Sequence, residues 1–148
     1  MAKRAKNNAI LSVFRFKAAY LIMKKDIEGE DDIKLLVDTF YDNVNQDNLL
    51  SPIFNSFAKV DWSLHLPVMY NFWSTVLFGS MAYKGQPFPK HLRLPIERTH
   101  FSRWTNLFTS TVDELFEGTK AEEAKQKALS IAHVFQLKME MNGVLKPQ

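Results

Sequence analysis

The chain has 148 residues, a formal net charge of +3 and no cysteine. Its length is typical of one domain that is large enough to enclose a cofactor. A chain without cysteine excludes disulfides, thiolate zinc sites, iron–sulfur clusters, thiolate-ligated haem and haem attached through C-x-x-C-H. A small fold without disulfides fits the cytoplasm, which is the expected location.

Positive charge is concentrated at the N-terminus. Residues 1–25 hold seven Lys or Arg residues and no acid, which leaves 12 basic and 16 acidic residues from Asp26 onward. Because the body is acidic, we expect no groove that tracks nucleic-acid phosphates.

The leader contains an apolar run at residues 9–23, which two charges interrupt and which is too short for a transmembrane span. We expect a basic apolar leader at 1–25, disordered or an over-extended start with Met23 as the alternative start, before a domain at 26–148. A helix packed on the body and a membrane-surface anchor remain alternatives, and membrane contact is the less favoured one.

After the leader, Asp31 or Asp32 is expected to cap a helix. Its apolar positions recur at helical spacing and are Ile33, Leu36, Val37, Phe40, Tyr41 and Val44. The segment 45–60 contains Pro52 and several polar residues, which predicts a compact loop or a short helix.

Pro67 is expected to be the first residue of the next helix and Gly79 its end, which places His65 at the mouth of that helix. Glycines and prolines in 79–96 leave room for a turn or two of helix around 88–94, which carries His91. Two longer helices are expected at about 97–118 and 121–141. No segment alternates like a strand, so the predicted fold class is all-α.

Two histidines lie in aromatic-rich helical segments of this cysteine-free chain. His65 belongs to the run 62–73, and His91 to the proline-punctuated stretch 86–95. Two imidazoles on such a scaffold suggest a haem pocket, in which one nitrogen binds iron and a second polar group faces the ligand.

Seven short motifs follow one another between Ile33 and Phe135. They are Phe40-Tyr41, Leu50-Ser51-Pro52-Ile53-Phe54, Trp62-x-x-His65, Phe72-Trp73, Tyr83-x-Gly85-x-Pro87, Lys90-His91-Leu92 and His100-Phe101-x-x-Trp104. In this order they resemble the group III truncated haemoglobins, small bacterial globins with a two-over-two helical sandwich. The resemblance implies a non-covalent haem b and says nothing about residues 1–25.

The resemblance also implies a role for individual positions. His91 matches the proximal iron ligand of that family. Tyr41, His65 and Trp104 match its polar residues on the distal side, where the gas binds. Four further positions match the lining of the haem cavity: Phe40, Met69, Phe72 and Leu94.

The chemistry of these side chains agrees with the implied roles. Iron(II) takes a neutral imidazole whose other nitrogen is hydrogen-bonded, and we expect a backbone carbonyl in the turn 88–90 to accept that bond. Tyr41 can donate to a gas through its phenol, and Trp104 can donate only through its indole N–H. Donors of this kind slow the escape of dioxygen.

Two classes of function follow. One is reversible binding of dioxygen and other diatomic gases. The other is enzymatic, either nitric-oxide dioxygenation or peroxide reduction with His65 as the distal base. Because no glycine pattern matches G-x-G-x-x-G, dioxygenation requires an external electron donor.

Two further interpretations depend on other features of the chain. Glu97-x-x-His100 has the spacing of a di-iron ligand pair, but no second motif of this kind accompanies it. A cofactor-free helical interaction domain, in which the aromatic residues are only core, is the distant alternative.

Overall fold

Four long helices and two short helical turns make up the part of the chain that the structure describes, residues 23–146 of a computed structural model. In chain order they are α2 (Glu30–Gln46), η1 (Ile53–Phe57), α3 (Trp62–Phe78), η2 (Pro89–Arg93), α4 (Arg98–Leu115) and α5 (Thr119–Met141). η1 is a π-helical turn and η2 a 3-10 helix. These residues contain no strand, and the predicted all-α class is confirmed.

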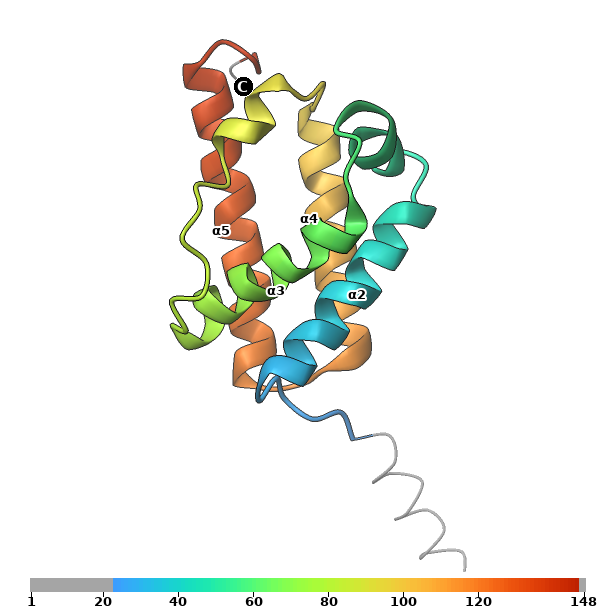
Figure 1. Ribbon diagram of the computed structural model, residues 1–148, viewed down its shortest axis with the longest axis vertical. Coiled ribbons are helices and arrows are strands. Elements are labelled where there is room, and N and C mark those ends of the chain that lie inside the picture. Colours follow the sequence, from blue (N-terminus) through green and yellow to red (C-terminus); the bar gives the residue numbers. More distant parts are fainter. Residues whose placement is uncertain (1–22, 147–148) are drawn as a thin grey trace, which may run out of the picture.

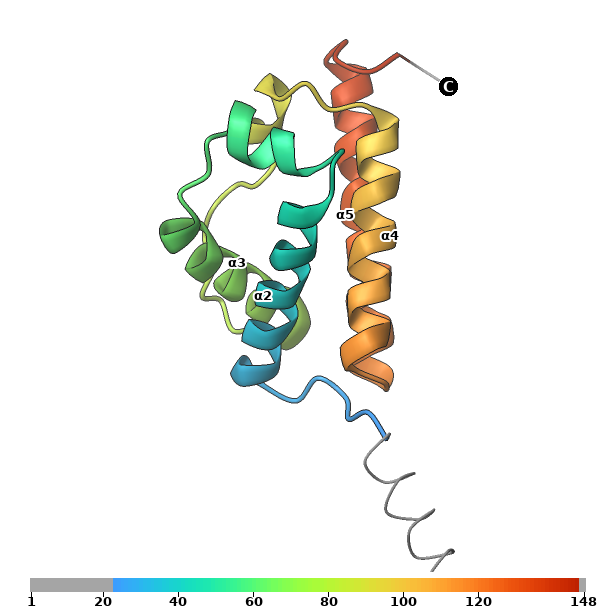
Figure 2. The ribbon, with the colours of Figure 1, turned by 90° about the vertical axis from the view of Figure 1, so that its right-hand side faces the viewer.

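The long helices form two layers. Figure 2 shows α2 and α3 in one layer and the pair α4 and α5 in the other. α2 contacts both α3 and α4, so it joins the layers. The predicted two-over-two helical sandwich is therefore confirmed. The predictions made for residues 1–22 lie outside the described residues.

The prediction that Asp31 or Asp32 caps α2 is wrong. The helix begins at Glu30, with Gly29 before it, and both aspartates lie in its first turn. Asp32 instead reaches back, where its carboxylate accepts from the backbone N–H of Glu28 at 2.9 Å. Acidic side chains in a first turn also interact favourably with the positive end of the helix dipole.

The start of α3 also differs from the prediction, whereas its end agrees. Asp61 caps the helix, because its carboxylate accepts from the backbone N–H of Ser63 at 3.0 Å. Pro67 therefore lies inside α3, where it lacks the N–H that would bond the Ser63 carbonyl. His65 thus lies within the helix. Gly79 ends it in the left-handed conformation, with φ 65°, as predicted.

The residues directly before α2 are hydrogen-bonded to the beginning of α5. The side chain of Asp26 accepts from the backbone N–H groups of Lys120 and Ala121, at 2.9 and 2.8 Å. Ile27 is fully buried in the core. At Gly118 a Cβ atom would overlap the Asp26 side chain, so this close approach requires glycine. The residues that precede α2 are therefore part of the packed domain.

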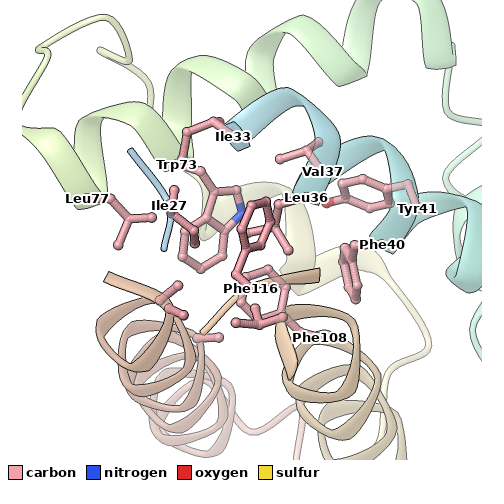
Figure 3. Close-up of a cluster of buried hydrophobic side chains, with 14 of the residues drawn as sticks. Ile27, Ile33, Leu36, Val37, Phe40, Tyr41, Trp73, Leu77, Phe108 and Phe116 are labelled. Carbon is pink, nitrogen blue, oxygen red and sulfur yellow. The ribbon is translucent and has the colours of Figure 1, made fainter. Parts of the chain in front are cut away.

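Aromatic and aliphatic side chains together fill the space between the two layers (Figure 3). Trp73 of α3 stacks on Phe108 of α4, with ring centroids 4.6 Å apart. Phe40 of α2 meets Phe108 edge-on at 5.1 Å. All three side chains are almost completely buried. This core fixes how α2, α3 and α4 are oriented around the space next to it.

Among the described residues, no helix is both long enough and apolar enough to cross a membrane.

Candidate functional site

A cavity of about 410 Å³ lies beside this core. Its walls come from α2, η1, α3, the segment 79–96, α4 and α5, and they are mainly apolar. Figure 1 shows that η2 lies at one end of the molecule, beside the C-terminal half of α5. The volume falls in the range of roughly 300–1,000 Å³ typical of sites for small molecules and cofactors.

Most of the predicted site residues line this one cavity, although they come from distant parts of the chain. They are Tyr41, His65, Met69, Phe72, His91, Leu94 and Trp104. Phe40, expected among the lining residues, is not one of them. It is 1% exposed and packs edge-on against Trp104, Phe108 and Tyr41. Phe40 therefore supports the cavity from behind.

His91 is held in a fixed orientation by η2. Its Nδ1 lies 2.7 Å from the carbonyl oxygen of Pro87, so Nδ1 carries the proton and donates. The acceptor lies one residue before the turn 88–90 in which it was expected. The imidazole also meets the ring of Phe135 at 4.9 Å. This arrangement leaves the lone pair of Nε2 free.

The His91 ring is neutral at pH 7. Burial lowers its pKa, and the charge of the adjacent Lys90 acts in the same direction, against the hydrogen bond to Pro87. A neutral imidazole with one nitrogen bonded to a carbonyl is the form that binds iron or other transition metals.

His65 faces the cavity from the first turns of α3. Its Nε2 is buried and has no hydrogen-bond partner, the one side-chain atom of this kind among residues 23–146. Burial lowers its pKa, and so do the charges of His91 and Lys90. A buried nitrogen without a partner is costly in an apolar site, so it indicates a position where a ligand completes the bonding.

Tyr41 lies next to His65 in a cluster of rings. Its ring centroid is 5.5 Å from that of His65, 5.3 Å from that of Trp62 and 5.8 Å from that of Phe54. Burial raises the pKa of its phenol well above the usual value, and no hydrogen bond contributes to that shift. The hydroxyl therefore keeps its proton at every physiological pH and can donate it in a hydrogen bond.

Trp104 joins the core to the cavity. Its indole stacks on Phe108 with centroids 5.7 Å apart and an interplanar angle of 14°, and Phe40 meets it edge-on at 5.7 Å. The core thus fixes the plane of a ring that also lines the cavity.

The cavity contains residues that the sequence interpretation did not assign to the site. Phe135 packs on His91, and Lys90 and His100 line the wall. Three residues of α5 also line the cavity at helical spacing: Ile131, Ala132 and Phe135. Helical spacing indicates a buried face but does not distinguish a cavity wall from a core. The sequence could have indicated Lys90 as a residue of the site, because it is adjacent to His91.

His100 is not part of a di-iron ligand pair. Its Nδ1 accepts from the backbone N–H of Glu97 at 3.0 Å, at the beginning of α4. No cluster of three or more His, Asp or Glu side chains suited to a metal ion occurs in the described part of the chain. With Nδ1 engaged as an acceptor, Nε2 of His100 carries the proton and can donate.

Comparisons with known proteins agree with this geometry. Residues 24–141 match the model of the family described as bacterial-like globin. A curated relative, "Group 3 truncated hemoglobin ctb" of Campylobacter jejuni, is 33% identical over 118 residues, which are 77% of this chain and 93% of the relative. The crystal structure of the group III truncated hemoglobin from Campylobacter jejuni superposes with a TM-score of 0.72 at 33% identity. That match covers 79% of this chain and 95% of the other.

Proposed function

Since the chain belongs to the bacterial-like globin family, we propose that it holds a non-covalent haem b through His91 and reversibly binds dioxygen and other diatomic gases. When bound, the haem supplies the ferrous iron that takes up the gas. The observation that carries the proposal is the pairing of His91 Nδ1 with the Pro87 carbonyl, on the wall of an apolar cavity.

The chain's residues fit a haem on the proximal side. Proline at 87 and 89 stiffens the backbone around η2, so that His91 keeps one orientation without help from a ligand. The Pro87 carbonyl increases the basicity of Nε2, the nitrogen that would bind the iron. Phe135 packs edge-on against the imidazole and restricts its rotation.

Two wall residues suit the carboxylates that a haem carries. Lys90 is an exposed cation that lines the cavity, and His100 has its Nε2–H available. A lysine and an imidazole donor at the cavity wall would bind propionate groups by charge-assisted hydrogen bonds.

Tyr41, His65 and Trp104 would act on the gas. The phenol of Tyr41 keeps its proton, and the indole N–H of Trp104 can only donate, so both would donate a hydrogen bond to dioxygen. The unpartnered Nε2 of His65 provides a third polar atom. Hydrogen bonds to a charged acceptor contribute roughly 1.5–3 kcal/mol each, so these donors favour slow release of dioxygen.

Peroxide reduction is a second candidate function, and the His65 geometry supports it. Its Nε2 is buried, has no partner, and belongs to a ring whose pKa burial lowers, so it is neutral at pH 7 and able to take a proton. If His65 acts as this base, His65→Leu will slow peroxide consumption by the ferric protein at least tenfold. An unchanged rate would exclude this activity.

Heterologous expression with a haem supply tests the main proposal. We expect a red protein with a strong Soret band and about one protohaem per chain in a pyridine haemochromogen assay. The His91→Ala variant should fold, because residue 91 lies in a short surface helix, but should retain little haem. Colourless, folded wild-type protein that takes up no added hemin would refute the proposal.

A further inference from the structure

The stretch of chain that encloses one side of the cavity carries no carboxylate. From Trp62 to Ile96 the sequence contains no Asp or Glu, although the chain from Asp26 onward is acidic as a whole. The same stretch contains Lys84, Lys90 and Arg93, and all three are exposed.

Lys138 of α5 extends this group of cations. Its Nζ lies 5.1 Å from the ring centroid of Phe88, directly before η2, and it is exposed. We call Lys84, Lys90, Arg93 and Lys138 the cationic face. In Figure 1 the segment that carries the first three runs along α5 and ends in η2.

The cationic face differs from most of the described surface in how its charges are paired. Of the ten other Lys and Arg residues among 23–146, only Lys24, Lys59, Lys127 and Lys146 form no ion pair. Elsewhere the cations of six residues form ion pairs with nearby carboxylates: Lys25, Lys34, Arg98, Arg103, Lys120 and Lys125. None of the four residues of the cationic face forms an ion pair with a described carboxylate. With haem bound, Lys90 would pair with a propionate, so the charge available to a partner comes from Lys84, Arg93 and Lys138. Unpaired charges of one sign on a single face produce a field that reaches into solvent.

Carboxylates outnumber cations at the opposite end of the described residues. Asp113 and Glu114 lie at the end of α4, Glu117 follows it, and Glu122 and Glu123 lie in the first turns of α5. Lys120 and Lys125 pair with three of these five carboxylates. Among residues 23–146 the unpaired positive charge is therefore concentrated toward η2 and the cavity; the five basic residues of 1–22 lie outside this part of the chain. A partner with a compact negative surface would be oriented by this field before contact.

We propose that the cationic face is the docking surface for an acidic electron-donor protein that reduces the haem iron. The inference rests on the proposed function, because it requires a haem bound through His91. Lys90 and Arg93 flank His91 within η2, so a donor docked there would lie over the residue that holds the iron.

The electron count of this step is simple. One electron would leave the reduced iron–sulfur or flavin centre of the donor, which is oxidised, and would reduce the ferric iron of a haem held by His91 to ferrous iron. No covalent bond forms or breaks. An external donor is needed because no glycine pattern in the chain matches the dinucleotide-binding fingerprint.

The charge distribution favours a small acidic protein over a nucleic acid. A long polyanion would extend from the few cations of this face onto the acidic remainder of the body, where it would be repelled. A compact acidic protein can contact the cationic face alone. Charges at the rim of such an interface mainly change the association rate and its dependence on salt.

The test uses the ferric holoprotein and a plant-type ferredoxin as the acidic donor. The dissociation constant of the oxidised ferredoxin is measured by calorimetry, and reduction by the photoreduced ferredoxin is followed in a stopped-flow instrument. The test variant is Lys84→Glu/Arg93→Glu, which leaves every cavity-lining residue in place. The matched control, Lys24→Glu/Lys127→Glu, makes the same charge change at two exposed cations that form no ion pair and lie outside the cationic face.

For the test variant we expect binding and reduction to weaken about tenfold or more at low ionic strength. The control should change either quantity less than about twofold. The difference between the wild type and the test variant in ferredoxin binding and reduction should disappear toward about 1 M salt, where the screening length is ~3 Å. Reduction by photoreduced lumiflavin, a small neutral donor, should be the same in all three proteins.

Equal effects in the test and control variants, or no effect in either, would overturn the docking inference. So would binding of the wild-type protein to anionic vesicles or to duplex DNA that is lost in the test variant while ferredoxin binding is unchanged. A protein that takes up no haem would instead refute the proposed function, so the two failures are distinguishable.

Discussion

The core and the cavity are built from neighbouring residues of the same helices, but a buried polar atom without a hydrogen-bond partner occurs only at the cavity among the described residues. Phe40 and Tyr41 are adjacent in α2, but only Tyr41 lines the cavity. Trp73 is buried in the core, whereas Phe72 beside it lines the cavity. The core is apolar and closely packed, whereas the cavity contains an imidazole nitrogen without a partner. Aromatic content alone thus does not distinguish the core from the cavity. The polar atom without a hydrogen-bond partner does distinguish them.

The largest effect should come from truncating a core ring. For Trp73→Ala we expect a loss of about 3–5 kcal/mol in the free energy of unfolding, because a large buried side chain is replaced by a void. Phe72→Ala should cost clearly less, because its removal enlarges a cavity that is already present. Urea unfolding of the apoprotein measures both values. Equal losses in the two variants would contradict the division into core and cavity.

Removing the Tyr41 hydroxyl should change the rate at which dioxygen dissociates and leave the fold unchanged. For Tyr41→Phe we expect the dioxygen off-rate to rise roughly ten- to a hundredfold, which corresponds to one lost hydrogen bond of about 1.5–3 kcal/mol. Trp104→Phe should change the rate in the same direction. Stopped-flow replacement of dioxygen by carbon monoxide measures it.

Tyr70→Phe is the matched control for this experiment. Tyr70 belongs to α3, but its hydroxyl bonds to the Asp38 carboxylate and does not line the cavity. Its off-rate should equal that of the wild type. If Tyr41→Phe and Tyr70→Phe behave alike, Tyr41 has no role toward the gas.

A smaller effect concerns pH. Burial lowers the pKa of His65 and of His91 below the ordinary value of 6.5, so the unfolded chain binds protons at a higher pH than the folded apoprotein does. Stability is therefore complete above about pH 6.5 and decreases as the pH falls below it.

His65→Leu should reduce this dependence of the urea midpoint between about pH 7.5 and 5.5, because one of the two groups is removed. His133→Leu is a suitable control, because His133 is exposed on α5. A slope that His65→Leu leaves unchanged would show that His65 is not protected from protonation in the folded chain.

Much of the fold was predictable from local patterns. The helical spacing of apolar residues indicated α4 and α5 to within a few residues, and Gly79 marked the end of α3. The beginning of α3 was not predicted correctly, because the preference of proline for a first turn was given more weight than the capping carboxylate of Asp61. Both signals are local, and their relative strength depends on the surrounding packing.

The candidate site was less accessible to sequence reasoning. The resemblance to a family supplied the residues, and the structure brings most of them to one cavity. It did not indicate that Phe40 faces away, since successive helical residues point about 100° apart and the pattern does not say which one faces a cavity. Nor did it indicate that the Pro87 carbonyl accepts the hydrogen bond from His91, because every residue has a backbone carbonyl and the sequence does not show which one lies near the imidazole.

The central claim, that His91 binds the iron, is tested most directly by resonance Raman spectroscopy of the ferrous protein in the iron–histidine stretching region. We expect a stretching band in the wild type, its loss in His91→Gly, and its return when imidazole is added to that variant. A band that persists unchanged in His91→Gly without imidazole would show that another residue holds the iron.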